Sequence, residues 1–180
     1  MKNRNIVQQL PQKDEWITPD YVFKELNKEF DFHLDLTCSK NNCKTIRGCM
    51  IDKGNDGLKF DVERFFEKND IDYEAKLNIW CNPPYSRNLK EAFIKKCIEL
   101  SKSKLVGCVV MLLPVSTSTQ IFHRYIIPNA EEIRFIEKRI NFEGINTKNE
   151  VVKNKAGMHD SMVVVIKSPQ SPNFKFSSRG

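Results

Sequence analysis

The tetrapeptide Asn82-Pro83-Pro84-Tyr85 contains the residues of this chain that are best suited to chemistry on a ligand. It follows the apolar run 77–81, which is short and bounded by polar residues, so this run is predicted to be a buried strand. Prolines cannot donate ladder hydrogen bonds, and the strand therefore has to end at the tetrapeptide. The prediction is a rigid turn at the carboxyl end of a strand, the edge at which open α/β sheets bind ligands.

This turn has the groups needed to hold a planar amine. An exocyclic amine on a heteroaromatic ring is a poor nucleophile, because its lone pair is delocalised into the ring. Acceptors for both amine hydrogens draw the nitrogen toward tetrahedral geometry, and the Asn82 amide oxygen and the rigid Pro83 carbonyl can serve as these acceptors. Tyr85 can stack on the face of a base. A methyl sulfonium held in line would complete a direct displacement, with no metal and no covalent intermediate.

Residues for a donor pocket are expected at neighbouring strand ends. Asp35, at the end of a predicted strand over 32–36, suits a cationic amino-acid moiety, although it could be an ordinary surface aspartate. Thr18-Pro19 predicts a helix start, with threonine as the cap, and places a helix amino terminus where it could meet a carboxylate. Asp56 lies in a turn and could accept a hydrogen bond from an adenine amine, and Asp61 competes for this role.

Strands and helices are predicted to alternate along the chain. Apolar patterns predict strands at 32–36, 45–51, 77–81, 105–113, 132–136 and 161–166, and helices at 19–30, 58–67, 86–101 and 116–125. This order favours an α/β fold with a mostly parallel, twisted sheet covered by helices on both faces. The continuous apolar run 105–113 predicts a central strand. The final strand follows its predecessor without an obvious crossover helix and is expected to be antiparallel.

Length and composition fit one domain. The 180 residues are divided into polar tails at 1–13 and 168–180 and a single domain at 14–167, with a polar, basic loop at 138–157. The net charge of +6 weakly favours anionic partners. The longest apolar stretch, 105–115, is too short for a bilayer, and no secretory signal is visible, so we expect no membrane partner and a reducing cytoplasm.

The six cysteines raise the question of a metal. Three lie in apolar runs and are expected in the core. Cys38, Cys43 and Cys49 cluster in the sequence with His33, but their spacing lacks the paired C-x-x-C form of common zinc sites. The sequence therefore predicts no metal site.

Several motifs occur in an order that resembles the small, phage-type Dam-like DNA N6-adenine methyltransferases. The resemblance runs from about Asp14 to Lys167. It depends on the segments Asp-Glu-Trp-Ile-Thr-Pro (14–19), Leu-Asp-Leu-Thr-Cys-Ser (34–39), Asn-Asp-Gly-Leu (55–58), Trp-Cys-Asn-Pro-Pro-Tyr-Ser (80–86), Met-Leu-Leu-Pro (111–114) and Arg-Ile-Asn-Phe (139–142).

The resemblance implies a Rossmann-like class I methyltransferase fold that uses S-adenosylmethionine in a bacterial or phage-infected host cell. In that pattern the methionine end of the donor is lined by Trp16, Thr18, Pro19, Asp35 and Thr37, and Asp56 or Asp61 lies near its adenine. Asn82, Pro83, Pro84 and Tyr85 would be catalytic. Unlike the common donor loop, residues 37–42 contain no glycine.

Double-stranded DNA is the implied partner, methylated at a specific site. Arg139 and Phe142 would lie at the substrate edge, with Phe142 either against a flipped adenine or in the core. No separate recognition domain is visible, so Lys148, Lys153 and Lys155 of the basic loop are candidates for phosphate contacts, unless this loop is only a solvated one. Three alternatives stay open: methylation of RNA adenine, methylation of a protein glutamine, and a non-catalytic nucleic-acid-binding relic of the fold.

Overall fold

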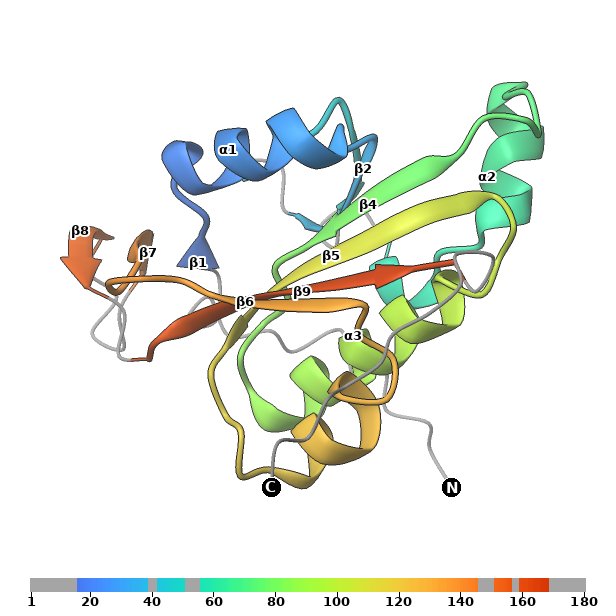
Figure 1. The fold of residues 1–180 in the computed structure, drawn as a ribbon. Coiled ribbons are helices and arrows are strands. Elements are labelled where there is room, and N and C mark those ends of the chain that lie inside the picture. The colour runs from blue at the N-terminus through green and yellow to red at the C-terminus, as the bar shows by residue number, and fades with distance from the viewer. Residues whose placement is uncertain (1–15, 39–41, 51–55, 146–150, 157–158, 169–180) are drawn as a thin grey trace, which may run out of the picture.

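A six-stranded sheet, in the order β3-β2-β4-β5-β9-β6, is the centre of the protein (Figure 1). The structure is a computed structural model that describes residues 16–38, 42–50, 56–145, 151–156 and 159–168. The strands are β2 (Leu34–Cys38), β3 (Arg47–Met50), β4 (Leu77–Cys81), β5 (Val106–Pro114), β6 (Glu132–Phe135) and β9 (Ser161–Lys167). Neighbours from β3 to β5 are parallel, whereas β9 is antiparallel to both β5 and β6. The predicted mostly parallel sheet and its antiparallel last strand are confirmed.

The central position of β5 is also confirmed. Its ladder with β9 runs from the pair Cys108↔Lys167 to the pair Pro114↔Ser161. Successive side chains of a strand point to opposite faces, so Met111 packs into one hydrophobic cluster and Leu112 into the other.

Helices cover both faces of the sheet (Figure 1). On one face lies α1 (Asp20–Phe30), where Phe23 meets the ring of Trp80 at 5.6 Å between centroids. The other face is covered by α2 (Val62–Asn69) and α3 (Arg87–Leu100), which bury Phe66 and Phe93. Each helix thus covers a set of strand side chains that would otherwise be exposed to water.

Two predicted helices differ from the observed ones. The pattern 58–67 is divided into a 3-10 turn, η4 (Gly57–Lys59), and α2, because the Asp61 side chain accepts a hydrogen bond from the backbone N–H of Arg64 and starts a new helix. The pattern 116–125 gives only the π-helical segment η5 (Phe122–Ile126). There the Thr119 hydroxyl accepts a hydrogen bond from the backbone N–H of Phe122, as an N-cap residue does, so the helical turns start only after Thr119.

The prediction of a loop at 138–157 is wrong. This segment contains β7 (Asn141–Ile145) and β8 (Val151–Ala156), which pair with each other and with β1 (Trp16–Ile17) in a second, antiparallel sheet of order β1-β7-β8. The sequence pattern does not reveal this sheet, because β1 has two residues and its partner lies more than a hundred positions away.

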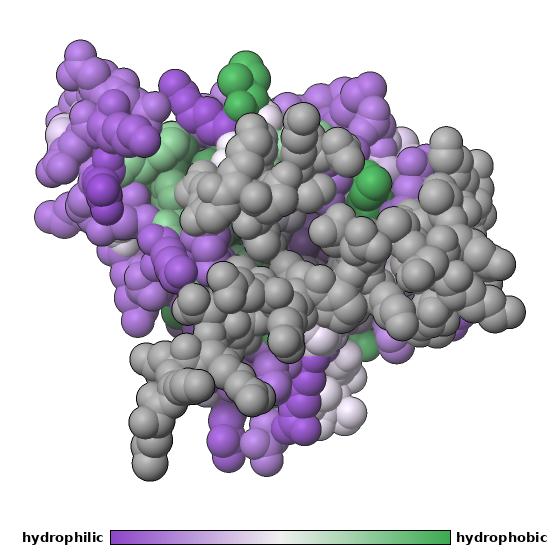
Figure 2. Space-filling view, turned by 180° about the vertical axis from the view of Figure 1, so that it is seen from behind, coloured by the Kyte–Doolittle hydropathy of each residue, from purple (hydrophilic) through white to green (hydrophobic). Residues whose placement is uncertain are grey.

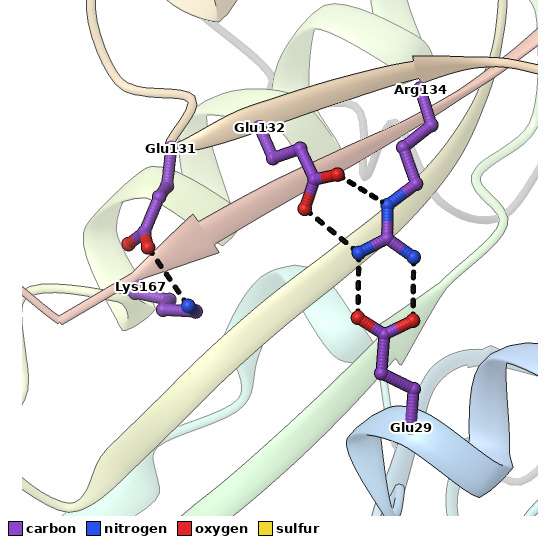
Figure 3. A network of polar contacts seen from close by, with 5 residues as sticks. All are labelled: Glu29, Glu131, Glu132, Arg134 and Lys167. Carbon is purple, nitrogen blue, oxygen red and sulfur yellow. Dashed lines mark hydrogen bonds and ion pairs between the residues drawn. The ribbon is translucent and has the colours of Figure 1, made fainter. Parts of the chain in front are cut away.

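An ion-pair network joins α1 to β6 at the edge of the large sheet (Figure 3). Two nitrogens of Arg134 donate to the two carboxylate oxygens of Glu29, each at 2.6 Å, and Arg134 also bonds to Glu132. The hydrogen bonds from Arg134 lower the pKa of both carboxyl groups. A second pair joins Lys167 to Glu131 at 2.8 Å.

The outer surface is polar where Figure 2 shows it. Hydrophilic residues predominate over the described part of that face, and the hydrophobic ones form small separate groups. Within the described ranges, no helix has both the length and the apolar character that a membrane span requires.

Candidate active site

Three segments distant in the sequence meet at the carboxyl ends of β2 and β4. These strands are parallel neighbours, so Thr37 near the end of β2 lies beside Asn82, which follows β4. The Thr37 hydroxyl accepts a hydrogen bond from the backbone N–H of Asn82 at 3.0 Å. Thr18, just before α1, completes the group, and a cavity of about 10 Å³ opens between these residues and Asp35. That volume holds about one water molecule, so a larger ligand requires local opening.

The side-chain amide of Asn82 has a defined orientation. Its Nδ2 donates to the Trp16 carbonyl at 2.9 Å and to the Thr18 hydroxyl at 3.1 Å. A carbonyl can only accept, so the nitrogen has to lie on this side of the amide. The Asn82 Oδ1 is buried and has no hydrogen-bond partner among the described residues. A rigid turn therefore carries a free acceptor, as the chemistry of amine binding requires.

Tyr85 lies on the same turn with its ring half-buried. Its hydroxyl is buried without a hydrogen-bond partner in the part of the chain that the structure describes, and burial raises the pKa of Tyr85. The ring packs edge to face against Phe142, with 6.1 Å between centroids and 89° between planes. Phe142 also contacts Trp16 and is only 4% exposed. Of its two sequence interpretations, the structure shows core packing behind Tyr85, and no face of Phe142 is open to a base in this conformation.

Asp35 is a buried anion at this edge. Its carboxylate accepts hydrogen bonds from the backbone N–H groups of Thr37 and Lys44, each at 3.1 Å. Burial raises the pKa of Asp35 to about 6, against the opposing effect of these two bonds. The Lys44 ammonium is paired with Asp20 at 2.7 Å, and no ion pair to Asp35 is present within the described ranges. The site therefore offers a negative charge to a cationic ligand.

The prediction that Thr18 caps the first helix is wrong. Pro19 is the N-cap residue of α1, which starts at Asp20, and no side chain makes a capping bond there. The hydroxyl of Thr18 bonds to Asn82 instead. Ser86 is likewise the N-cap residue of α3, and its side chain makes no capping bond.

The structure separates the two aspartates that compete for the donor adenine. Asp56 is 5% exposed, its Oδ1 accepts from the Leu58 N–H at 3.0 Å, and none of the described residues donates to its buried Oδ2. Asp61 is exposed, caps α2 and lines a separate cavity of about 420 Å³. A free buried acceptor thus exists at Asp56 and not at Asp61.

The predicted DNA contacts are only partly described. Arg139 is half-exposed and donates from Nε to Asp160 at 3.1 Å. Lys148 lies outside the described residues. Lys153 and Lys155 fall on β8, where the structure describes the strand but not these side chains. Their contacts with phosphates stay predictions.

Sequence reasoning missed the group that orients Asn82 most directly. The Trp16 carbonyl belongs to the backbone, so no residue type marks it. Its one signal in the sequence is the position of Trp16 beside Thr18, within a motif that predicts donor binding.

Two comparisons with known proteins match most of this chain. A family model described as "DNA N-6-adenine-methyltransferase (Dam)" matches residues 7–179. A DNA N-6-adenine-methyltransferase of Haemophilus phage HP1 (strain HP1c1) is 30% identical over 163 residues, which are 89% of this chain and 82% of the phage protein. The matched range contains every segment that meets at the site.

Proposed function

Because the chain belongs to the family of DNA N-6-adenine-methyltransferases (Dam), we propose that it is a site-specific DNA methyltransferase that transfers the methyl group of S-adenosylmethionine to the N6 amine of adenine. The observation that carries this proposal is the orientation of the Asn82 amide. Two donated hydrogen bonds fix its nitrogen, and its buried oxygen is left without a partner among the residues described.

In the proposed mechanism the adenine leaves the duplex stack, because its amine cannot be reached inside it. One amine hydrogen is donated to Asn82 Oδ1 and the other to the Pro83 carbonyl, which localises the nitrogen lone pair. Pro84 keeps the turn rigid, and Tyr85 holds the ring of the base. When bound, S-adenosylmethionine supplies an electrophilic methyl group. Methylation of the amine held by Asn82 and Pro83 would leave the donor as a thioether and would release one amine proton to solvent.

The buried carboxylates fit this donor. Asp35, without an ion-pair partner within the described ranges, suits the donor's ammonium group, and the free Oδ2 of Asp56 suits its adenine amine, so we prefer Asp56 to Asp61. Trp16, Pro19 and Thr37 remain proposed neighbours of the methionine end. The hydroxyl of Thr18 already holds Asn82, so we propose that Thr18 mainly positions the catalytic amide. The order of the sheet, with an antiparallel β9 between β5 and β6, supports a Rossmann-like class I methyltransferase fold.

The DNA side of the proposal changes in one respect. Lys153 and Lys155 belong to strand β8, which pairs with β7 where a loop was predicted, and we propose that these two residues, Lys148 and Arg139 contact phosphates. Phe142 acts through Tyr85 rather than on the base. A single domain over 14–167 and a cytoplasmic setting in a bacterial or phage-infected host cell complete the proposal.

Replacement of Asn82 tests the catalytic assignment. Asn82→Ala should lower methyl transfer to duplex DNA by at least about a hundredfold, the usual cost of removing one preorganised hydrogen-bonding group, with donor affinity nearly unchanged. Asn129→Ala is the matched control, because Asn129 lies on the segment after η5 and its Nδ2 also donates to a backbone carbonyl, that of Tyr125. Near-normal turnover of Asn82→Ala would falsify the assignment.

The substrate is tested by incorporation of labelled methyl groups into duplex DNA, RNA and protein. We expect label in duplex DNA, at adenine N6. Label only in RNA would favour methylation of RNA adenine, and label only in protein would favour methylation of a glutamine amide. A chain without affinity for the donor would be a non-catalytic relic of the fold.

A further inference from the structure

Two thiols and a carboxylate lie close together beneath the candidate donor site. The carboxylate oxygen of Asp35 and the sulfurs of Cys38 and Cys43 all lie within 4.8 Å of one another. Cys38 is buried at the end of β2, and Cys43 is half-buried. His33, which the sequence grouped with these cysteines, is elsewhere: its Nδ1 accepts from the Asn78 backbone N–H at 3.1 Å. The spacing of the cysteines predicts no metal site, whereas the fold brings together Asp35, Cys38 and Cys43 as possible ligands.

Gly48 on β3 creates the space for the two sulfurs. A Cβ placed on Gly48 would lie 2.3 Å from the sulfur of Cys38 and 2.3 Å from that of Cys43. Both contacts are far shorter than van der Waals distance. Gly48 pairs with Asp35 across the sheet. Because Gly48 has no side chain, both thiols can occupy one small volume beside it.

This set of atoms suits a soft divalent cation. In a tetrahedral site with Zn–S bonds of about 2.3 Å, two thiolate sulfurs lie about 3.8 Å apart, so the observed arrangement needs only a small adjustment. Two thiolates, a carboxylate and one water are four suitable ligands. Lys44, whose backbone N–H donates to Asp35, has its ammonium group paired with Asp20, which weakens the repulsion of a cation by this lysine.

We propose that Asp35, Cys38 and Cys43 bind a soft divalent cation such as Zn²⁺, and that this cation competes with the methyl donor for Asp35. Both thiols lose their protons on binding, so each cation that enters releases two protons. The competition depends on the proposed function, since it requires the donor's ammonium group at Asp35. The cation site itself does not.

Cobalt(II) is the probe, used with the full chain in a phosphine reductant. Titration should give ultraviolet thiolate-to-cobalt charge-transfer absorption, which added Zn²⁺ removes. Cys43→Ala should weaken cobalt binding by at least about tenfold, and Cys38→Ala should do the same. Cys108→Ala is the matched control, because Cys108 is a thiol of β5 outside the cluster and this variant should bind cobalt like the parent chain. Circular dichroism verifies that each variant is folded.

The outcomes separate the two proposals. No charge-transfer band in the parent chain, or an unchanged band in both folded cluster variants, overturns the cation site. S-adenosylmethionine should displace bound cobalt, and a donor that binds without changing the band overturns the competition. If the band is present but the chain has no donor affinity, the cation site stands and the proposed methyl transfer fails.

Discussion

The orientation of the Asn82 amide can be tested through Thr18, a residue that need not touch the substrate. Thr18→Val removes the hydroxyl that accepts from Asn82 Nδ2 at 3.1 Å and keeps the volume of the side chain. Thr18 is 3% exposed, so water cannot easily replace the lost acceptor. Among the described residues, the Trp16 carbonyl is then the one remaining acceptor that holds the Asn82 amide in its active orientation.

The expected effect follows from the cost of the lost bond. A buried hydrogen-bonding group left unsatisfied costs roughly 1–3 kcal/mol. If about 1–2 kcal/mol of this cost falls on the active orientation of Asn82, kcat should fall about 5- to 30-fold. Thr18→Ser keeps the hydroxyl and should retain most of the activity.

The assay measures kcat by methyl incorporation into duplex DNA and donor affinity by calorimetry. We expect Thr18→Val to lower kcat, with a much smaller effect on donor affinity. Turnover of Thr18→Val equal to that of the parent chain, or equal losses in the valine and serine variants, would refute the reasoning. A loss of donor affinity alone would identify Thr18 as a donor ligand.

Three further predictions follow from the charges and packing. Burial raises the pKa of Asp35 to about 6, so the affinity for a cationic donor should fall about tenfold for each pH unit below 6 and stay constant above it. Calorimetry across pH 5–8 would measure this affinity. The same affinity at every pH would remove Asp35 from the donor site. Arg134→Met should cost about 0.5–1 kcal/mol of unfolding free energy near neutral pH, since these groups are partly exposed. The hydrogen bond from Arg134 lowers the pKa of Glu29, so this stabilisation is present above the ordinary carboxyl pKa and is lost as the pH falls through the lowered pKa of Glu29. If urea unfolding gives the same difference in stability between Arg134→Met and the parent chain at acidic and neutral pH, this reasoning is wrong. Gly48→Ala should destabilise the fold by about 1–3 kcal/mol, because the new methyl group would contact the sulfurs of Cys38 and Cys43. The double variant with Cys43→Ala should recover part of this loss. Additive effects of the two substitutions in denaturant melts would show that Gly48 and Cys43 do not share this space.

The reach of sequence analysis is clear from the strands. The prediction for 77–81 matches β4 residue for residue, because prolines end the strand and its apolar run is continuous. The strand predicted at 32–36 is observed as β2, which begins two residues later. The apolar pattern of the sequence does not distinguish an aromatic residue just before a strand from one inside the strand. The helix predicted at 86–101 is observed as α3 to within one residue at each end.

For the candidate site, too, some features follow from the sequence and others only from the structure. Asp56 and Asp61 gave equal signals in the sequence, and only burial and the capping bond of Asp61 separate them. The polar composition of 138–157 favours a loop, because a short sheet with a partner strand far away in the sequence has no strong local pattern.

The sequence by itself determined the α/β class, the proline-stiffened turn after β4 and the chemistry that Asn82 can offer, because these depend on residue type and on neighbours along the chain. Only the tertiary structure decided which way the Asn82 amide faces and that Asp35 lies beside two thiols. Both depend on contacts between segments far apart in the sequence, such as the Trp16 carbonyl and the bare α-carbon of Gly48, which no local pattern specifies.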